Sequence, residues 1–138
     1  GVHVRGTDMF IAGKQHNKPS SKLVDISWIE NIVNENSIDG IFLCTDDEDV
    51  VLKFQQFFGD KLFVTDSIRQ VAGRVEGIHF DNTLGNGRKH HKYLLGKEVI
   101  TDMYILSKCN ILVCAPSNVA FAAIIYNNGA YENIVYCT

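Results

Sequence analysis

The chain lacks any apolar run long enough to cross a membrane and any segment typical of a secretion signal. Its 138 residues are 46% hydrophobic, which is ordinary for a globular protein. No stretch approaches the roughly 18 consecutive apolar residues of a membrane span, and no basic, apolar and small-residue signal segment occurs. Length and composition therefore predict one domain with a hydrophobic core and without a membrane span.

Cysteine is scarce and is not spaced for metal binding. Four cysteines occur (Cys44, Cys109, Cys114 and Cys137), and none belongs to a CxxC or Cys/His pattern, so the sequence disfavours a zinc site. Three of them lie in or at the end of apolar, strand-like runs, as small buried hydrophobes of a reducing compartment do. No Asn-x-Ser/Thr sequon is present. We therefore expect a cytoplasmic protein, of bacterial origin, that binds no metal.

Basic charge is not in excess, and the common phosphate-binding motifs are absent. A net charge of −3 argues against general electrostatic binding of nucleic acid. Neither GxGxxG after the first strand nor GxxxxGK[ST] occurs, and no G-x-S-x-G elbow is found. The glycines at 85 and 87 fall inside a long loop and indicate turns. A small anionic ligand stays possible, because it needs only a local positive site.

Strand-like and helix-like patterns alternate along the chain. Helical spacing is clear where Ile26, Ile29, Ile32 and Val33 recur. A second apolar stripe follows an acidic cluster that suits a first helical turn; it comprises Val50, Val51, Phe54, Phe57 and Phe58. The predicted strands cover residues 1–4, 40–44, 60–65, 110–115 and 132–138. The last two predicted helices cover 96–109 and 116–128, the latter with Pro116 in its first turn.

This order predicts an α/β fold, a three-layer, Rossmann-like sandwich with a mostly parallel five-stranded sheet. Residues 41–44 and 111–114 are continuous apolar runs, as central strands covered on both faces require. The chain also begins directly on a strand, so we expect one half of a larger protein.

Polar residues follow the predicted strands at their carboxyl ends. In the opening GVHVRGTD, strand alternation puts His3 and Arg5 on one face. Open α/β sheets bind ligands at the carboxyl edge, and Arg grips phosphate through paired hydrogen bonds. The alternative is a structural ion pair of Arg5. Further polar residues follow the other strands: Thr7, Asp8, Thr45, Asp46, Asp47, Asp66, Ser67, Ser117 and Asn118.

A second anion-binding feature is expected where the last helix starts. Ser117 and Asn118 would bring free backbone N–H groups and a positive dipole end. Ser117 has no evident His partner, which disfavours a nucleophilic role. Asp102 could accept hydrogen bonds from a nucleobase. The alternatives are that Ser117, and Asp46 or Asp47, are helix N-caps, and that Asp102 is an ordinary helix-surface carboxylate.

Three segments together resemble a known family. GVHVRGTD, FLCTDD and D-x-x-x-L-S-x-C-x-x-L-V-C-x-x-S-N are similar to the three peptide motifs shared by α-1,6-fucosyltransferases, nodulation fucosyltransferases and protein O-fucosyltransferases. The resemblance implies a GT-B-like enzyme whose C-terminal, Rossmann-like half binds GDP-fucose and inverts the anomeric centre without a metal. This chain would be that half, a single domain over 1–138, with the N-terminal acceptor domain absent and the isolated fragment inactive.

The resemblance also implies roles for individual residues. Arg5 would contact the β-phosphate and stabilise the departing GDP. Asp102 would accept from the guanine edge, and His3 would lie near guanine or ribose. The phosphates would be held by Ser117 and Asn118, and the site would be supported by Asp8, a further catalytic candidate, and Asp47. Two departures from the family stand out, because Gly6 replaces a second Arg and Asn118 replaces a second Ser.

The expected partners are a GDP-sugar donor and, through the absent domain, a glycan acceptor, with no nucleic acid and no cofactor. A non-catalytic nucleotide-binding or regulatory module is the alternative. The basic stretch 88–92 falls in the loop before the predicted helix at 96. A solvated loop is the favoured interpretation, and a lid over the diphosphate is the functional one.

Overall fold

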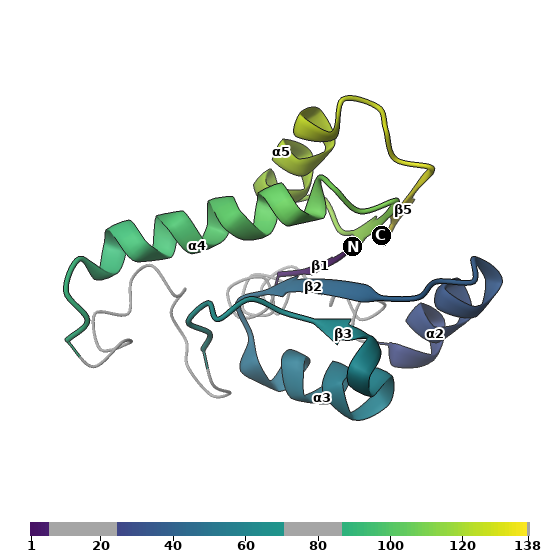
Figure 1. The fold of residues 1–138 in the computed structure, drawn as a ribbon, viewed down its shortest axis with the longest axis horizontal. Helices are drawn as coiled ribbons and strands as arrows, with labels where there is room; N and C mark the ends of the chain where they lie inside the picture. The colour runs from purple at the N-terminus through teal and green to yellow at the C-terminus, as the bar shows by residue number, and fades with distance from the viewer. Residues whose placement is uncertain (6–24, 71–86, 138) are drawn as a thin grey trace, which may run out of the picture.

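The sheet is parallel throughout its described part, as the alternating pattern predicts. The computed structural model describes residues 1–5, 25–70 and 87–137. Within them lie five strands in the order β3-β2-β1-β4-β5, shown in Figure 1. Their bounds are β1 (Val2–Val4), β2 (Ile41–Thr45), β3 (Leu62–Phe63), β4 (Ile111–Cys114) and β5 (Asn133–Tyr136). The three-layer α/β fold is confirmed, and β1 lies at its centre between β2 and β4.

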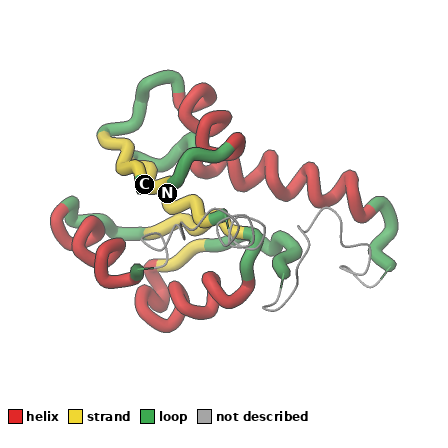
Figure 2. The backbone as a smooth tube through the Cα atoms, turned by 180° about the vertical axis from the view of Figure 1, so that it is seen from behind, coloured by secondary structure: helices red, strands yellow, loops and turns green. Residues whose placement is uncertain are grey.

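Helices cover both faces of the sheet, α2 (Ile26–Glu35) and α3 (Glu48–Phe58) on one and α4 (His91–Leu106) and α5 (Asn118–Asn127) on the other. Figures 1 and 2 show the sheet between these two layers from opposite sides. The alternation in β1 assigns its side chains to the two layers. Val2 and Val4 join the cluster under α2 and α3, whereas His3 is buried on the other face.

Two helices begin where the sequence indicates, because a carboxylate caps each. Asp25 accepts a hydrogen bond from the backbone N–H of Ser27, and Asp47 does the same for Asp49. The predicted apolar face of α2 is buried. The predicted stripe of α3 is wrong at Phe57, which is 58% exposed. Its neighbour Phe58 packs against the core cluster and against the ring of Phe54.

The predicted third strand is too long. Residues Gly59–Lys61 form a 3-10 turn, and only Leu62–Phe63 pair with β2. Thr65, which the pattern assigned to the strand, instead donates its hydroxyl to Asp102. A side-chain contact to α4 therefore replaces the ladder at that point.

The starts of α4 and α5 also differ from the prediction. Helix α4 begins at His91, so His91 and Lys92 of the basic stretch belong to its first turn, not to a loop. At α5, Pro116 lies before the cap, and the helix begins after Ser117, whose side chain accepts from the backbone N–H of Ala120. Ser117 is therefore the N-cap of α5, and Pro116 precedes the cap instead of occupying the first turn of the helix.

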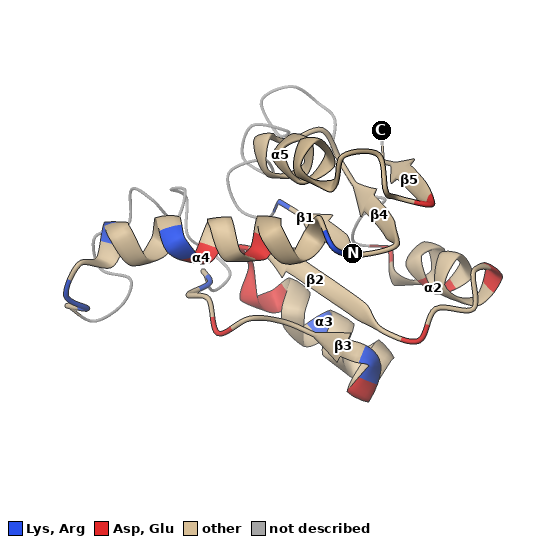
Figure 3. Cartoon of the chain, turned by 45° about the horizontal axis from the view of Figure 1, so that its top comes forward, with Lys and Arg blue, Asp and Glu red and all other residues tan. Residues whose placement is uncertain are grey.

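Of α4 and α5, the two helices on this face of the sheet, α5 is the apolar one. Small residues of α5, Ala120 and Ala123, are buried against the sheet, and α5 carries no Lys, Arg, Asp or Glu, so Figure 3 draws it entirely in tan. The four cysteines are free thiols, and Cys44, Cys114 and Cys137 are buried as predicted. Among the described helices, none combines the length and apolarity needed to cross a membrane.

Candidate functional site

A cavity of about 670 Å³ lies at the carboxyl ends of β1, β2 and β4, beneath the N-terminal parts of α4 and α5. Its lining combines polar and charged residues with apolar ones, as in small-molecule sites. The polar lining is His3, Arg5, Thr45, Asp46, Ser67, Lys92, Glu98, Asp102, Ser117 and Asn118. The apolar lining includes Leu95, Val99, Ile100 and Val119.

A second cavity, of about 690 Å³, lies at the opposite, amino edge of the sheet. Its described lining contains two carboxylates, Asp39 and Glu132, and no Lys, Arg or His side chain. Of these two cavities, the one at the carboxyl edge is therefore the one whose described lining offers cationic side chains to an anionic ligand.

His3 and Ser117 meet in the wall of the carboxyl-edge cavity. Ser117 Oγ lies 3.2 Å from His3 Nδ1 and also accepts from the Ala120 backbone N–H at 3.0 Å. The sequence missed this pair, because 114 positions separate the two residues. Burial, and then the charge of Arg5, lower the pKa of His3 to about 4. So weak a base would not activate a serine near neutral pH, and the pair is suited to binding.

Arg5 and Asn118 line the cavity and follow the strand and the cap that carry this pair. Arg5 follows β1 and is exposed, and Asn118 is the exposed first residue of α5. A helix start presents unpaired backbone N–H groups and the positive end of the helix dipole. Together with a guanidinium, these groups can hold a phosphate or diphosphate.

Asp102 is a buried carboxylate in α4, so the alternative of a helix-surface residue is wrong. Its side chain lines the cavity and accepts a hydrogen bond of 2.6 Å from Thr65. Burial raises the pKa of Asp102. The hydrogen bond from Thr65, the charge of Arg69 and the thiol of Cys44 oppose that rise, and Glu98 adds to it. Asp102 therefore has the Thr65 hydroxyl and the Cys44 thiol as hydrogen-bond donors and also lines the cavity.

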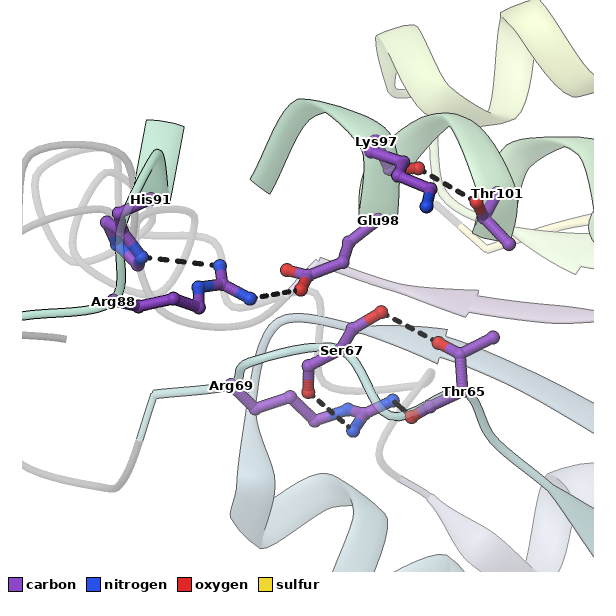
Figure 4. A network of polar contacts seen from close by, with 8 residues as sticks. All are labelled: Thr65, Ser67, Arg69, Arg88, His91, Lys97, Glu98 and Thr101. Carbon is purple, nitrogen blue, oxygen red and sulfur yellow. Dashed lines mark hydrogen bonds and ion pairs between the residues drawn. The ribbon is translucent and has the colours of Figure 1, made fainter. Parts of the chain in front are cut away.

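The start of α4 brings a cation and a second carboxylate to the cavity mouth. Lys92 and Glu98 line the cavity on the same helix. Glu98 pairs with Arg88 at 2.5 Å, and Arg88 also contacts His91 Nδ1 at 3.2 Å, as Figure 4 shows. Arg88 of the basic stretch is therefore engaged by the helix, while Lys92 faces the cavity.

The other predicted site residues lie apart from this cavity or outside the described residues. Asp47 is the N-cap of α3 and is not among the lining residues; its neighbour Asp46 is. Asp8 lies outside the described residues, so its expected role stays a prediction. Within the described ranges, no group of three or more His, Cys, Asp or Glu side chains could hold a metal ion.

Sequence reasoning did not single out Glu98 or Cys44 as cavity residues, or Thr65 as a partner of Asp102, and it considered Lys92 only as part of the basic stretch 88–92. A signal existed for Glu98, because it precedes Asp102 by four positions and such residues share a helix face. That signal was available from the sequence, because the helix predicted over 96–109 contains both residues.

The comparisons with known proteins bear on the fold. No protein-family model matches the sequence, and no curated protein matches it. The structure is similar to the crystal structure of NodZ alpha-1,6-fucosyltransferase co-crystallized with GDP, with a TM-score of 0.55 over 97% of this chain. The fold is fucosyltransferase-like.

The likeness to NodZ is structural and covers part of the NodZ chain. Sequence identity to NodZ is 17%, so the likeness concerns the fold. The chain spans 36% of the NodZ chain, about a third of its length. The expected similarity to fucosyltransferases is thereby confirmed for the fold. The activity has to be argued from the residues of the cavity.

Proposed function

We propose that this chain is the donor-binding domain of a glycosyltransferase, and specifically of an inverting fucosyltransferase that uses GDP-fucose. The observation that carries the proposal is the cavity that joins Arg5, Asp102 and the start of α5 at the carboxyl edge of the sheet. The similar fold of NodZ, which was co-crystallized with GDP, supports the same ligand class.

In the proposed complex, the diphosphate lies between Arg5 and the backbone N–H groups at Asn118. Departure of GDP from the sugar leaves negative charge on the β-phosphate, and a positive group already in place lowers the barrier. Arg5 and the α5 dipole supply that positive charge from the chain itself, so the proposal includes no metal.

The base of the nucleotide is proposed to lie toward Asp102. A carboxylate can accept the N1–H and the 2-amino N–H groups of guanine together, and no other common base presents that pair of donors. The uncharged imidazole of His3, held by Ser117, lies nearby in the same wall and is proposed to contact the guanine or ribose. Ser117 also helps to hold the phosphates.

The remaining parts of the proposal concern groups beyond the described site. Inverting transfer needs a base that removes the acceptor proton; Asp8 or a carboxylate of an N-terminal acceptor domain would serve. The isolated chain is then expected to bind donor and to transfer little sugar. The free thiols of all four cysteines suit a cytoplasmic enzyme.

Calorimetric titration of the chain with GDP, UDP and inorganic phosphate tests the proposal. We expect selective, micromolar GDP binding, at least about tenfold weaker in Arg5→Ala, since a charged hydrogen bond contributes ~1.5–3 kcal/mol. Lys61→Ala is the matched control, because Lys61 is exposed in the 3-10 turn before β3, at the far edge of the sheet.

Equal binding of GDP and UDP, or an equal effect of the two variants, would contradict the proposal. Absence of nucleotide binding would favour the alternative, a non-catalytic α/β regulatory module.

A further inference from the structure

Thr65 contacts Asp102, a carboxylate of the carboxyl-edge cavity, although Thr65 itself does not line that cavity. Its Oγ1 donates to Asp102 Oδ1 at 2.6 Å, across 37 positions of sequence. Asp102 lines the carboxyl-edge cavity, whereas Thr65 is not among its lining residues. Thr65 can therefore affect a ligand only through the cavity residues that it contacts, Asp102 and Ser67.

The direction of the hydrogen bonds around Thr65 follows from the chemistry of the groups. An ionised carboxylate can only accept, so the one hydroxyl proton of Thr65 points to Asp102. The 2.7 Å contact between Thr65 Oγ1 and Ser67 Oγ then has Ser67 as its donor. The result is a directed chain from Ser67 to Thr65 to Asp102.

The backbone that carries this chain is itself tied down. Arg69 donates from Nη2 to the Thr65 carbonyl at 2.8 Å and from Nη1 to the Ser67 carbonyl at 3.0 Å. Figure 4 shows the guanidinium against both carbonyls, beneath α4. Residues 65–69 therefore form a braced segment after β3, and the Thr65 hydroxyl is held at one place.

Asp102 keeps hydrogen-bonding capacity toward the cavity after these contacts. A carboxylate has about four lone-pair sites. Thr65 occupies one, and the Cys44 thiol contacts the group as well. Since Thr65 takes Oδ1 from the β3 side, rotation of the carboxylate about its last torsion is restricted, and acceptor sites stay directed at a ligand.

We propose that Thr65 is a positioning residue, which orients Asp102 and thereby sets the preference of the cavity for guanine over other purines. This inference rests on the proposed function for its ligand, and on the described contacts for its geometry. A fixed acceptor pair discriminates between bases by leaving a site group unpaired when the matching donor is absent.

Guanosine and inosine diphosphates separate the orienting role from general binding, because hypoxanthine lacks the 2-amino group and is otherwise identical at this edge. The wild type should bind GDP at least about tenfold more tightly than IDP, as the loss of one hydrogen bond to a charged group implies. In Thr65→Val, which removes the hydroxyl and keeps the shape, this ratio should fall to within about threefold of one. IDP affinity itself should change little.

Thr65→Ser is the matched control, since it restores the hydroxyl and should restore the GDP-to-IDP ratio. A merely structural role would weaken both nucleotides together and leave the ratio unchanged, and that result would overturn the proposal. Thermal unfolding of each variant shows that the comparison is made on folded protein.

The orientation can also be measured without a nucleotide. Carbon NMR titration of the Asp102 carboxyl should give a higher pKa in Thr65→Val than in the wild type and Thr65→Ser, because the hydroxyl favours the ionised form. An unchanged pKa in Thr65→Val refutes the contact. If the wild type binds neither GDP nor IDP, the proposed function and the base preference both fail, while this titration still decides whether Thr65 holds Asp102.

Discussion

The hydroxyl of Ser117 lies 3.2 Å from Nδ1 of His3, and the same oxygen caps α5 by accepting from the Ala120 backbone. The cap uses one lone pair of Oγ, so the hydroxyl can donate its proton to His3 Nδ1 or accept from Nδ1–H with its other lone pair. One serine thus starts a helix and also contacts a histidine on a different strand.

Replacement of Ser117 by Ala should destabilise the protein and weaken GDP binding. The lost N-cap costs about 1 kcal/mol, with up to about 2 kcal/mol in proteins, and His3 loses its partner as well. Urea denaturation measures the change in the free energy of unfolding. Ser117→Thr keeps the hydroxyl and is the control; equal stability of Ser117→Ala and wild type would contradict the capping role.

His3 should make stability depend on pH between about 4 and 6.5. The pKa of His3 is lowered from 6.5 to about 4 in the folded state, so the unfolded chain binds more protons in this window. Stability therefore rises with pH across it, and up to about 3 kcal/mol is lost as pH falls to 4. Denaturation of the wild type and His3→Asn at several pH values should show a flatter profile in the variant.

Asp102→Asn should separate stability from binding. Burial raises the pKa of Asp102, so the folded state holds its proton to higher pH than the unfolded state. The contribution of Asp102 to stability then falls as pH rises from 3.8 through the raised pKa. At pH 7 the variant should be at least as stable as the wild type.

Binding should change in the opposite sense, with GDP affinity lower by about tenfold or more in Asp102→Asn, because guanine loses a charged acceptor. Calorimetry measures this effect. A variant that is strongly destabilised and binds GDP normally would show that Asp102 has a structural role only.

The basic stretch offers a matched pair of lysines. Lys92 lines the cavity in the first turn of α4, whereas Lys89 is exposed and is not among the lining residues. If these residues close over a diphosphate, Lys92→Ala should raise the GDP dissociation constant by about three- to tenfold, and Lys89→Ala should not. In a full enzyme the same change should raise the donor KM. Equal, unchanged affinities would reject the lid interpretation.

Much of the fold could be predicted because the deciding signals are local. The spacing of Ile29 and Val33 and the caps at Asp25 and Asp47 give α2 and α3 their place. The apolar runs of β2 and β4 identify strands covered on both faces. The prediction failed where tertiary contacts replace local pattern, as at the short β3.

The start of α4 was also mispredicted. The helix has little apolar periodicity, since Tyr93, Val99 and Ile100 are exposed while Leu95 is buried. The ion pair between Arg88 and Glu98 joins the preceding turn to the helix. No pattern within 88–92 reveals a contact made one turn or more later in the helix.

The sequence by itself determined that Arg5, Ser117 and Asn118 follow strands of a parallel sheet, because strand periodicity and helix starts are set by neighbouring residues. Only the tertiary structure decided that β4 lies beside β1, which brings Ser117 to His3. It also decided that Thr65 reaches Asp102 from behind the cavity. Strand order and burial are properties of the whole packed chain, and the state of each site group depends on them.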